Sequence, residues 1–421
     1  MKRHVVKALA VAVGLALAAA GCSKGDDSAS TSGGRSTITI ALWNFEKTPE
    51  FKALIDGFKA DNPDVDVQYT DILADNYSDK LTTMLAGGDQ TDVLTMKNVT
   101  DYARYATRGQ LASLTDEAKK LDKAKYRGLD PFDLKGEYYA LPYRSDFWVL
   151  FYNKTMLKDA GADLSNLTWQ EYDDLAKKLT KGDGATKVYG TYHHVWRSVV
   201  QAIASAQTGG DQLTGDYQWM KEQYTMALDV QKAGATIPWA TANTQKVSYQ
   251  TMFGTEKTAM LPMGTWYAAS LLADLAAGKV KVDWGIAPMP QIARNGKVTT
   301  FGSPTAFAVN KKAKNAKAAT KFVTWASGPK GAAAIAKIGV TPAYNDQSIT
   351  DAYFSVKGMP SDDLSKKAFQ PTDVRLEMPV SDKSSDVDAI LREEHQLIMT
   401  GEKTIDAGIA EMAKRVKSEV N

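Results

Sequence analysis

Between residues 37 and 96 the apolar side chains alternate between the spacing of a strand and the spacing of a helix. Three segments have strand spacing or form a short apolar run: 37–42, 65–69 and 92–96. Two segments between them have helical spacing: 51–58 and 77–85. Strands that alternate with helices form a parallel sheet covered on both faces. The chain is therefore predicted to have an α/β fold, in which ligands bind beyond the carboxyl ends of the strands.

A second set of elements of the same kind begins after Tyr143. Residues 148–152 form the continuous apolar run that is typical of a buried strand. Thr168 and Glu171 have the spacing of a capping box, which predicts the start of a helix. With 421 residues the chain is longer than one typical domain, so we expect two lobes.

The first residues of the chain do not share this pattern and are typical of a targeting segment. Lys2, Arg3 and Lys7 give a positively charged start. Residues 8–20 are small and apolar, but a helix that spans a membrane needs about 20 apolar residues. Residues 1–21 are therefore predicted to be a signal peptide.

Cys22, the only cysteine of the chain, follows this segment directly. It is either an incidental residue after an ordinary signal peptide or part of a lipoprotein signal. The stretch resembles a bacterial lipoprotein signal peptide, and this resemblance implies that Cys22 becomes the lipidated first residue, with palmitate among its acyl chains. Residues 22–36 are rich in Ser, Gly and Asp, which predicts a flexible tether.

Charge and motifs exclude several classes of function. The net charge is +2, and no basic stripe supports binding to nucleic acid. The chain has no Gly-x-Ser-x-Gly, no His-Glu-x-x-His and no phosphate loop. The side chains of the adjacent pair His193 and His194 diverge, which favours packing over a metal site. We expect a monomer with no cofactor and no metal.

Four segments in this order resemble the extracellular solute-binding proteins of the maltose and multiple-sugar class of ABC importers. They contain Leu-Pro-Tyr, Tyr-Asn-Lys, Thr-Trp-x-Glu and Gly-x-Trp signatures. The segments are 38–67, 136–179, 253–266 together with 283–291, and 301–346. The resemblance implies a type II periplasmic-binding-protein fold, with parallel-dominated sheets flanked by helices and a hinge between two lobes.

The same resemblance implies where the lobes divide. Lobe 1 is expected to comprise 37–145 and 303–342, and lobe 2 to comprise 146–302 and 343–421. The chain is expected to cross the hinge near 144–148, near 303–305 and near Pro342. The resemblance also implies a carbohydrate-binding protein that is anchored by lipid outside the cytoplasm. Such a protein closes its lobes on a mono- or oligosaccharide and delivers it to the permease of an ABC transporter.

A sugar has apolar C–H faces and a rim of hydroxyl groups, so its site needs aromatic platforms and polar side chains. The chain has nine tryptophans. Each tryptophan candidate is equally a candidate for core packing, but Trp266 has the Gly-x-Trp turn, which includes Gly264, that the family stacks on sugar rings. The aromatic candidates are Trp43, Trp196, Trp239 and Trp266.

The polar candidates lie on predicted loops and at the hinge. By the resemblance, Glu46 and Lys47 match an acidic and basic pair that contacts sugar hydroxyls, and Asp146 matches a carboxylate at the hinge. Alternatively, Asp146 forms a structural salt bridge with Arg144. The remaining polar candidates are Lys97, which follows the third strand together with Asn98, and Arg375, which precedes a proline-containing loop.

Two alternatives remain open. Glu46 and Asp146 could be the paired carboxylates of a glycosidase, although no catalytic motif supports an enzyme. The solute could also be a peptide, a polyamine, or an iron or phosphonate compound, because function depends on the site and not on the fold. The many aromatic residues and the near-neutral charge favour a neutral polyol. Nothing in the chain hydrolyses ATP, so the motor is a separate protein.

Overall fold

The computed structural model describes residues 35–158, 160–294 and 296–420. The N-terminal segment with Cys22 lies outside the described residues, so the structure does not bear on it. The strands are β1 (Ser36–Trp43), β2 (Val65–Ile72), β3 (Val93–Met96), β4 (Asp133–Leu134), β5 (Glu137–Tyr138), β6 (Ala140–Asn153), β7 (Tyr189–Thr191), β8 (Thr258–Gly264), β9 (Trp284–Ala287), β10 (Thr299–Val309) and β11 (Asp373–Leu376).

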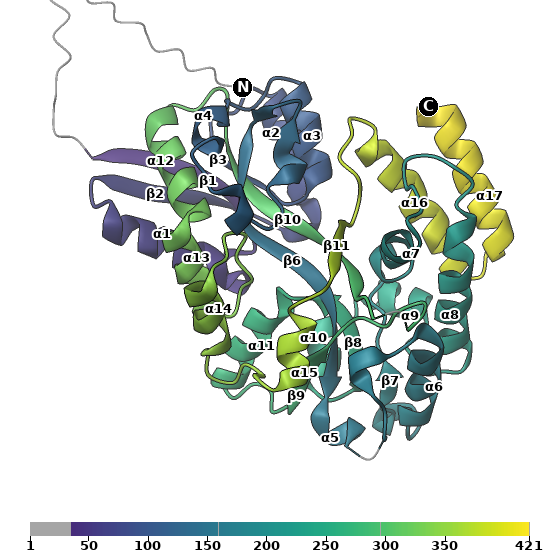
Figure 1. Ribbon diagram of the computed structural model, residues 1–421. Helices are drawn as coiled ribbons and strands as arrows, with labels where there is room; N and C mark the ends of the chain where they lie inside the picture. The colour runs from purple at the N-terminus through teal and green to yellow at the C-terminus, as the bar shows by residue number, and fades with distance from the viewer. Residues whose placement is uncertain (1–34, 159, 295, 421) are drawn as a thin grey trace, which may run out of the picture. The chain divides into compact units, whose positions relative to one another are not determined.

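Helices flank these strands along the whole described chain (Figure 1). They are α1 (Pro49–Asp61), α2 (Tyr77–Ala86), α3 (Val99–Thr107), α4 (Thr115–Ala118), α5 (Lys154–Leu157), α6 (Trp169–Leu179), α7 (Gln201–Thr208), α8 (Lys221–Lys232), α9 (Trp239–Thr244), α10 (Tyr249–Gly254), α11 (Tyr267–Ala276), α12 (Ala316–Ser327), α13 (Pro329–Ala336), α14 (Gln347–Phe354), α15 (Asp363–Ala368), α16 (Ser384–Met399) and α17 (Ile405–Arg415). None of the helices that the structure describes is both long and apolar enough to cross a membrane.

The local signals in the sequence act as predicted. The strand and helix spacings between residues 37 and 96 give β1, α1, β2, α2 and β3 in that order. The predicted capping box opens α6, because the Thr168 hydroxyl accepts from the Glu171 amide and the Glu171 carboxylate accepts from the Thr168 amide. The apolar run 148–152 is the second half of β6.

The main sheet has nine strands and is mixed. Its order is β2-β1-β3-β10-β6-β8-β7, with β11 paired to β10 and β9 paired to β6. Four pairs are parallel, namely β1–β2, β1–β3, β10–β11 and β7–β8. Four are antiparallel, namely β10–β3, β10–β6, β6–β8 and β6–β9. The α/β class is confirmed, but the expected dominance of parallel pairing is wrong because the long strands β6 and β10 run through the centre antiparallel to each other and to most of their neighbours.

Three segments that are distant in sequence lie side by side at the middle of these long strands. Arg144 pairs with Thr305, and Asp146 pairs with Ser303. Arg144 also forms a bridge with Pro342. The three segments in which hinge crossings were expected are therefore adjacent in the structure.

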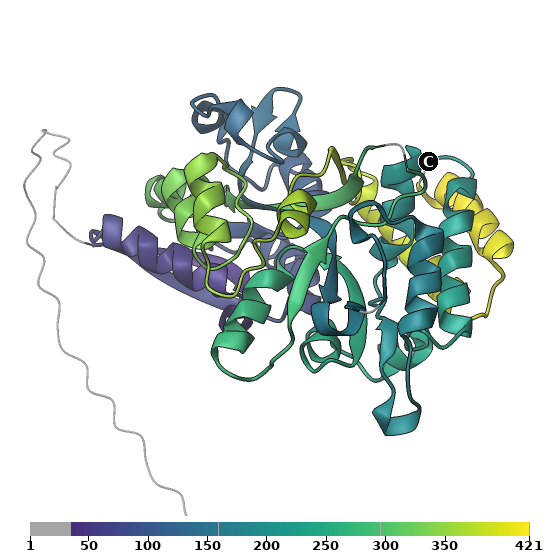
Figure 2. The same ribbon diagram turned by 60° about the horizontal axis from the view of Figure 1, so that its bottom comes forward.

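The buried apolar side chains of the described residues form two cores on either side of this place. The first core takes its residues mainly from 38–143 and 306–340, and the second mainly from 147–301 and 344–416. Ala269 joins the first core, and Ala332 and Ala336 join the second. In two views the C-terminal helices α16 and α17 lie beside α8, within the region of the second core (Figures 1 and 2). The lobe boundaries expected from the sequence stay a prediction.

Candidate functional site

The carboxyl ends of β1, β2 and β3 lie at one edge of the first half of the sheet, because the three strands are parallel. The chain leaves β1 into a 3-10 turn, η1 (Phe45–Lys47), and leaves β2 into another, η2 (Ala74–Asn76). Asn44 joins the two exits: its amide donates to Ile72 O at 3.1 Å, and its side-chain oxygen accepts from the Ala74 amide at 3.2 Å. Lys97, which follows β3, donates to Ala74 O at 2.6 Å.

In the second half of the sheet, β7 and β8 are parallel and their carboxyl ends also share an edge. The chain that follows β7 carries His194 and Trp196, and the chain that follows β8 carries Thr265 and Trp266. Two of the four predicted tryptophans, Trp196 and Trp266, therefore occupy the position at which α/β sheets bind their ligands.

These residues form a cluster of aromatic rings, which we call the tryptophan cluster: Trp148, Trp196, Trp266, His194 and Tyr249. Trp148 is buried in β6 and contacts Trp266 edge-on at 5.8 Å between ring centroids and Trp196 at 6.5 Å. Trp196 lies 6.3 Å from Trp266 and 6.0 Å from Tyr249. The Trp266 indole N–H donates to the Tyr249 hydroxyl at 3.4 Å.

Four members of the cluster are partly reachable from solvent, because only Trp148 is buried. Trp196 is 40% exposed, and its ring stacks on the His194 imidazole at 4.3 Å with an interplanar angle of 9°. Trp266 is half-buried. A stacked aromatic pair with one outer face open is the construction that a flat apolar ligand surface needs.

Gly264 is required for the position of the Trp266 ring. A Cβ atom at residue 264 would lie 1.8 Å from Cζ3 of Trp266 and 2.2 Å from its Cε3. Any larger residue at the end of β8 would therefore displace the ring from its contacts with Trp148 and Tyr249. The glycine of the Gly-x-Trp turn acts by making room for the tryptophan.

A buried ion cluster lies beside the tryptophan cluster, which we call the carboxylate–arginine triad: Glu50, Arg144 and Asp146. Glu50, in the first turn of α1, is 2% exposed and accepts from the Arg144 guanidinium. Asp146 is also 2% exposed, and its Oδ2 lies 3.0 Å from Nε of Arg144. The predicted alternative of a salt bridge between Arg144 and Asp146 is therefore present.

The triad joins the first core to the loop that carries Trp266. The Thr265 hydroxyl donates to Asp146 Oδ1 at 2.9 Å, and Arg144 Nε lies 3.2 Å from the Thr305 hydroxyl. Burial raises the pKa values of Glu50 and Asp146, and the nearby Arg144 charge opposes this effect at both carboxyl groups.

Lys97 and Trp43 lie on the first-core side of this region. Trp43 is 6% exposed, and its ring packs edge-on against Phe51 and Tyr77 at 5.0 and 5.1 Å. Lys97 Nζ lies 5.6 Å from the centre of that ring. Burial lowers the pKa of Lys97, and Asp75 acts in the opposite direction. Trp43 thus lies beneath a half-buried cation and offers little open ring face.

Residues from the two halves of the sheet influence one another electrostatically here. Burial lowers the pKa of His194 to about 4, and Asp75, on the loop after β2, opposes this effect. Burial raises the pKa of Tyr249, while Arg144 lowers it and Asp146 raises it further. The tryptophan cluster, the triad and the loop after β2 therefore belong to one region.

The structure places the other predicted site residues elsewhere. Glu46 and Lys47 are exposed on η1, at the edge that carries Lys97. Trp239 begins α9 instead of lying on a loop; it is 8% exposed, and its indole N–H donates to Val195 O at 3.0 Å inside the second core. Arg375 lies in β11 and pairs with Asp373 at the surface. Through its bond to Val195 O, Trp239 contacts the backbone between His194 and Trp196 from inside the second core, whereas no contact of the described residues joins Arg375 directly to the tryptophan cluster.

Sequence reasoning did not single out several residues of this region. Trp148 lies within an apolar run and reads only as a strand residue, and Tyr249 carries no motif. Glu50 follows a proline in the first turn of a helix, where an acidic residue is ordinary. The one available signal was the pair His193 and His194, because His194 follows a strand end by three residues.

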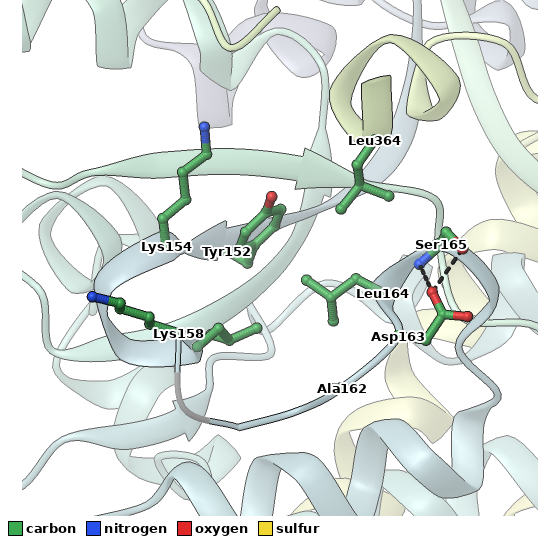
Figure 3. A pocket seen from close by; sticks show the side chains of 9 residues that line it. Tyr152, Lys154, Lys158, Ala162, Asp163, Leu164, Ser165 and Leu364 are labelled. Carbon is green, nitrogen blue, oxygen red and sulfur yellow. Dashed lines mark hydrogen bonds between the residues drawn. The ribbon is translucent and has the colours of Figure 1, made fainter. Parts of the chain in front are cut away.

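A separate hollow of about 420 Å³ lies beside α5 (Figure 3). In this view the ammonium groups of Lys154 and Lys158 point away from Leu164. None of the predicted site residues lines it. Its lining residues are Tyr152, Lys154, Leu157, Lys158, Ala162, Asp163, Leu164, Ser165 and Leu364. Within the described ranges, no three His, Cys, Asp or Glu side chains are arranged to hold a metal ion.

Comparison with known proteins gives consistent matches. The family model described as bacterial extracellular solute-binding protein matches residues 43–333. A multiple sugar-binding protein of Streptococcus mutans is 23% identical over 309 residues, which cover 68% of this chain and 70% of that protein. A maltooligosaccharide ABC transporter solute-binding lipoprotein of Streptococcus pneumoniae is 26% identical over 260 residues, 58% of this chain and 57% of that protein. The crystal structure of a sugar transporter from Rhizobium etli in an open conformation is 34% identical, with a TM-score of 0.76, and covers 91% of this chain and 99% of that chain.

Proposed function

The chain belongs to the bacterial extracellular solute-binding proteins, and from this premise we propose that it captures a carbohydrate outside the cytoplasm and delivers it to the permease of an ABC transporter. The predicted family and its two-lobed fold are thereby confirmed. The similar proteins are named as binding proteins or transporters, and we assign this chain the binding role.

The tryptophan cluster is the observation that carries the proposal. It combines a half-buried Trp266 and a Trp196 that is 40% exposed, both at the carboxyl ends of strands. Aromatic faces at this position match the apolar C–H faces of a sugar ring. Relatives named for multiple sugars and for maltooligosaccharides support the same class of ligand.

The charges around the cluster favour a neutral ligand. Glu50, Asp146 and Asp75 carry acidic groups, and Arg144 and Lys97 carry basic groups, so the numbers of the two signs differ by only one. Lys97, which is half-buried, supplies a donor for hydroxyl groups. A polyamine or a phosphonate would require a larger excess of one sign of charge, so we rank such solutes below a sugar.

The glycosidase alternative gains no support from the placement of its two carboxylates. Asp146 is buried and held by Arg144 and Thr265, whereas Glu46 is exposed on η1. A glycosidase needs two carboxyl groups that face one another across the scissile bond. The described interactions of Asp146 instead connect the two halves of the sheet.

A binding screen tests the proposed function. Thermal unfolding of the protein is measured against mono- and oligosaccharides, polyamines and peptides. A solute at 100 times its dissociation constant adds about 2.7 kcal/mol to the free energy of unfolding, which shifts the melting temperature by a few degrees. Shifts with polyamines or peptides and none with any sugar would reject the carbohydrate assignment.

For the anchor, we propose lipidation at Cys22 after removal of residues 1–21. The name of the Streptococcus pneumoniae relative as a lipoprotein supports this proposal. Two acyl chains suffice for stable membrane binding, whereas one does not. Cys22→Ser is expected to release the protein from the membrane fraction. A variant that stays in the membrane fraction would contradict lipid anchoring at this residue.

A further inference from the structure

Among the described residues, four large apolar side chains are exposed: Tyr69 at 43%, Leu73 at 69%, Trp196 at 40% and Ile292 at 48%. Trp196 belongs to the tryptophan cluster. Tyr69 and Leu73 lie near the carboxyl end of β2, at the edge that also carries η1, η2 and Lys97. Ile292 lies elsewhere, on the loop after β9.

The Tyr69 ring is stacked on a second ring in the same way as the Trp196 ring. Its ring stacks on the Phe45 ring at 4.2 Å with an interplanar angle of 15°, just as Trp196 stacks on His194. In both pairs one ring is backed by a parallel ring while a large part of its surface stays open. Phe45, Tyr69 and Leu73 together are called the rim shelf below.

Specific hydrogen bonds hold the rim shelf in place. The Phe45 amide donates to Asp71 Oδ1 at 3.1 Å, two residues after Tyr69. Asn44, in the left-handed conformation with φ 42°, bonds to the backbone on both sides of Leu73, at Ile72 and Ala74. An asparagine tolerates this conformation better than most residues. The shelf is thus a built surface and not a frayed loop.

The rim shelf is continuous with the region of the tryptophan cluster. Ala74, next to Leu73, accepts the hydrogen bond from Lys97, whose ammonium lies over Trp43. Asp75, the next residue, acts electrostatically on both Lys97 and His194. The loop after β2 therefore connects the rim shelf with the surroundings of His194, the residue on which Trp196 stacks.

We propose that the rim shelf is an outer subsite that stacks a second sugar ring, so that the ligand is an oligosaccharide and not a monosaccharide. This inference rests on the proposed carbohydrate-binding function. Two separate aromatic platforms, one on each half of the sheet, each match one apolar ring face. Among the described residues no ring contact joins Tyr69 to the tryptophan cluster, so we assign each platform its own sugar ring.

Calorimetry on the full-length processed protein tests the subsite. The probes are graded series from the monosaccharide to the hexasaccharide of gluco-, xylo-, arabino- and galacto-oligosaccharides. In the series that binds, affinity is expected to rise with chain length. Tyr69→Ala should weaken binding of the longer members about tenfold and leave the shortest ligand unchanged, and Leu73→Ala should act in the same direction.

Two control variants make the result specific. Tyr69→Phe keeps the ring and should keep the affinity, and Ile292→Ala removes an equally exposed apolar side chain and should change nothing. Equal affinity of the wild type for monosaccharide and oligosaccharide would overturn the subsite and leave the proposed function intact. The same conclusion would follow if the Tyr69→Ala and Leu73→Ala proteins bound every chain length as the wild type does. A wild-type protein that binds no carbohydrate would overturn both.

Discussion

At the scale of single residues, Gly264 and Trp266 act as a unit. Trp266 is half-buried against Trp148 and Tyr249, so it is neither a free surface ring nor a core residue. The contacts that hold it depend on the absence of a side chain at residue 264. Affinity for the ligand should therefore respond to a change at a residue that offers no functional group.

Trp266→Ala is expected to weaken sugar binding by at least about thirtyfold, because the loss of an aromatic anchor typically costs about 2 kcal/mol or more. Gly264→Ala should reproduce most of this loss, since the added Cβ displaces the indole. The melting temperature of the ligand-free Trp266→Ala protein should change little. Calorimetric titration and thermal unfolding of the same variants measure both quantities.

Gly285 provides a matched control. A Cβ atom at this residue of β9 would lie 2.5 Å from Cζ of Tyr152, so Gly285→Ala also displaces an aromatic ring. The displaced ring, Tyr152, is not a member of the tryptophan cluster. It should lower the melting temperature and leave the affinity unchanged. Loss of stability without loss of affinity in Trp266→Ala would show that this residue is core packing.

Arg144 should be the most sensitive residue of the triad. It is the only member with a positive charge, and it faces two carboxyl groups that are each 2% exposed. Arg144→Met is expected to lower the free energy of unfolding by about 3–5 kcal/mol, because removal of one partner leaves buried charges unpaired. Denaturant unfolding checks the value. Asp146→Asn, which keeps the acceptor for Thr265, should cost less than Arg144→Met.

At the scale of elements, two histidines attach helices to the second core. His193, two residues after β7, contacts the Tyr172 hydroxyl of α6 at 2.9 Å, and His395 of α16 contacts the Tyr224 hydroxyl of α8 at 3.0 Å. Burial lowers the pKa of His193 to about 4 and that of His395 to about 3. Both imidazoles are therefore neutral in the folded protein at pH values where they are protonated in the unfolded chain.

The free energy of unfolding should fall as the pH falls below about 6.5, because the unfolded chain then binds protons that the folded protein does not. Each histidine contributes a slope of up to about 1.4 kcal/mol per pH unit. Buried carboxyl groups with raised pKa, such as Glu50, act with the opposite sign. His395→Asn keeps a polar partner for Tyr224 and removes one titration.

Urea unfolding at pH 6.5 and pH 5 measures this effect. The wild type should lose up to about 2 kcal/mol more over this interval than His395→Asn. Equal losses in the two proteins would mean that His395 does not titrate as its buried position requires. The comparison of the two proteins cancels the contribution of the carboxyl groups.

At the scale of the whole molecule, the three adjacent segments in which hinge crossings were predicted lie between two separate cores. This arrangement suits a rigid-body rotation of one lobe against the other about a few backbone positions. A ligand drives such closure only if it binds the closed state better than the open state. Small-angle scattering with saturating sugar should therefore show a smaller radius of gyration.

Trp266→Ala serves as the control for closure. At the same sugar concentration it should bind weakly and keep the radius of gyration of the free protein. A wild-type protein with calorimetrically confirmed binding and an unchanged scattering profile would contradict hinge closure.

The amino-acid sequence alone determined the local elements and much of their order. Apolar spacing predicted β1 to β3 and the apolar half of β6, and the side chains of Thr168 and Glu171 predicted the start of α6. These features depend on residues close together in the chain, since side-chain periodicity and helix capping act over a few residues. The Gly-x-Trp turn at Gly264 and Trp266 was visible for the same reason.

Only the tertiary structure decided which of these residues meet. Glu50 pairs with Arg144 across 94 positions, Trp148 joins the tryptophan cluster from inside an apolar strand, and Trp239 is buried in the second core. Periodicity indicates that a side chain is buried but does not identify its neighbour, because the neighbour comes from a distant segment. The mixed sheet and the position of the rim shelf beside Lys97 arise in the same way, from the antiparallel pairing of β6 and β10 and from the hydrogen bonds that join the ends of β1, β2 and β3.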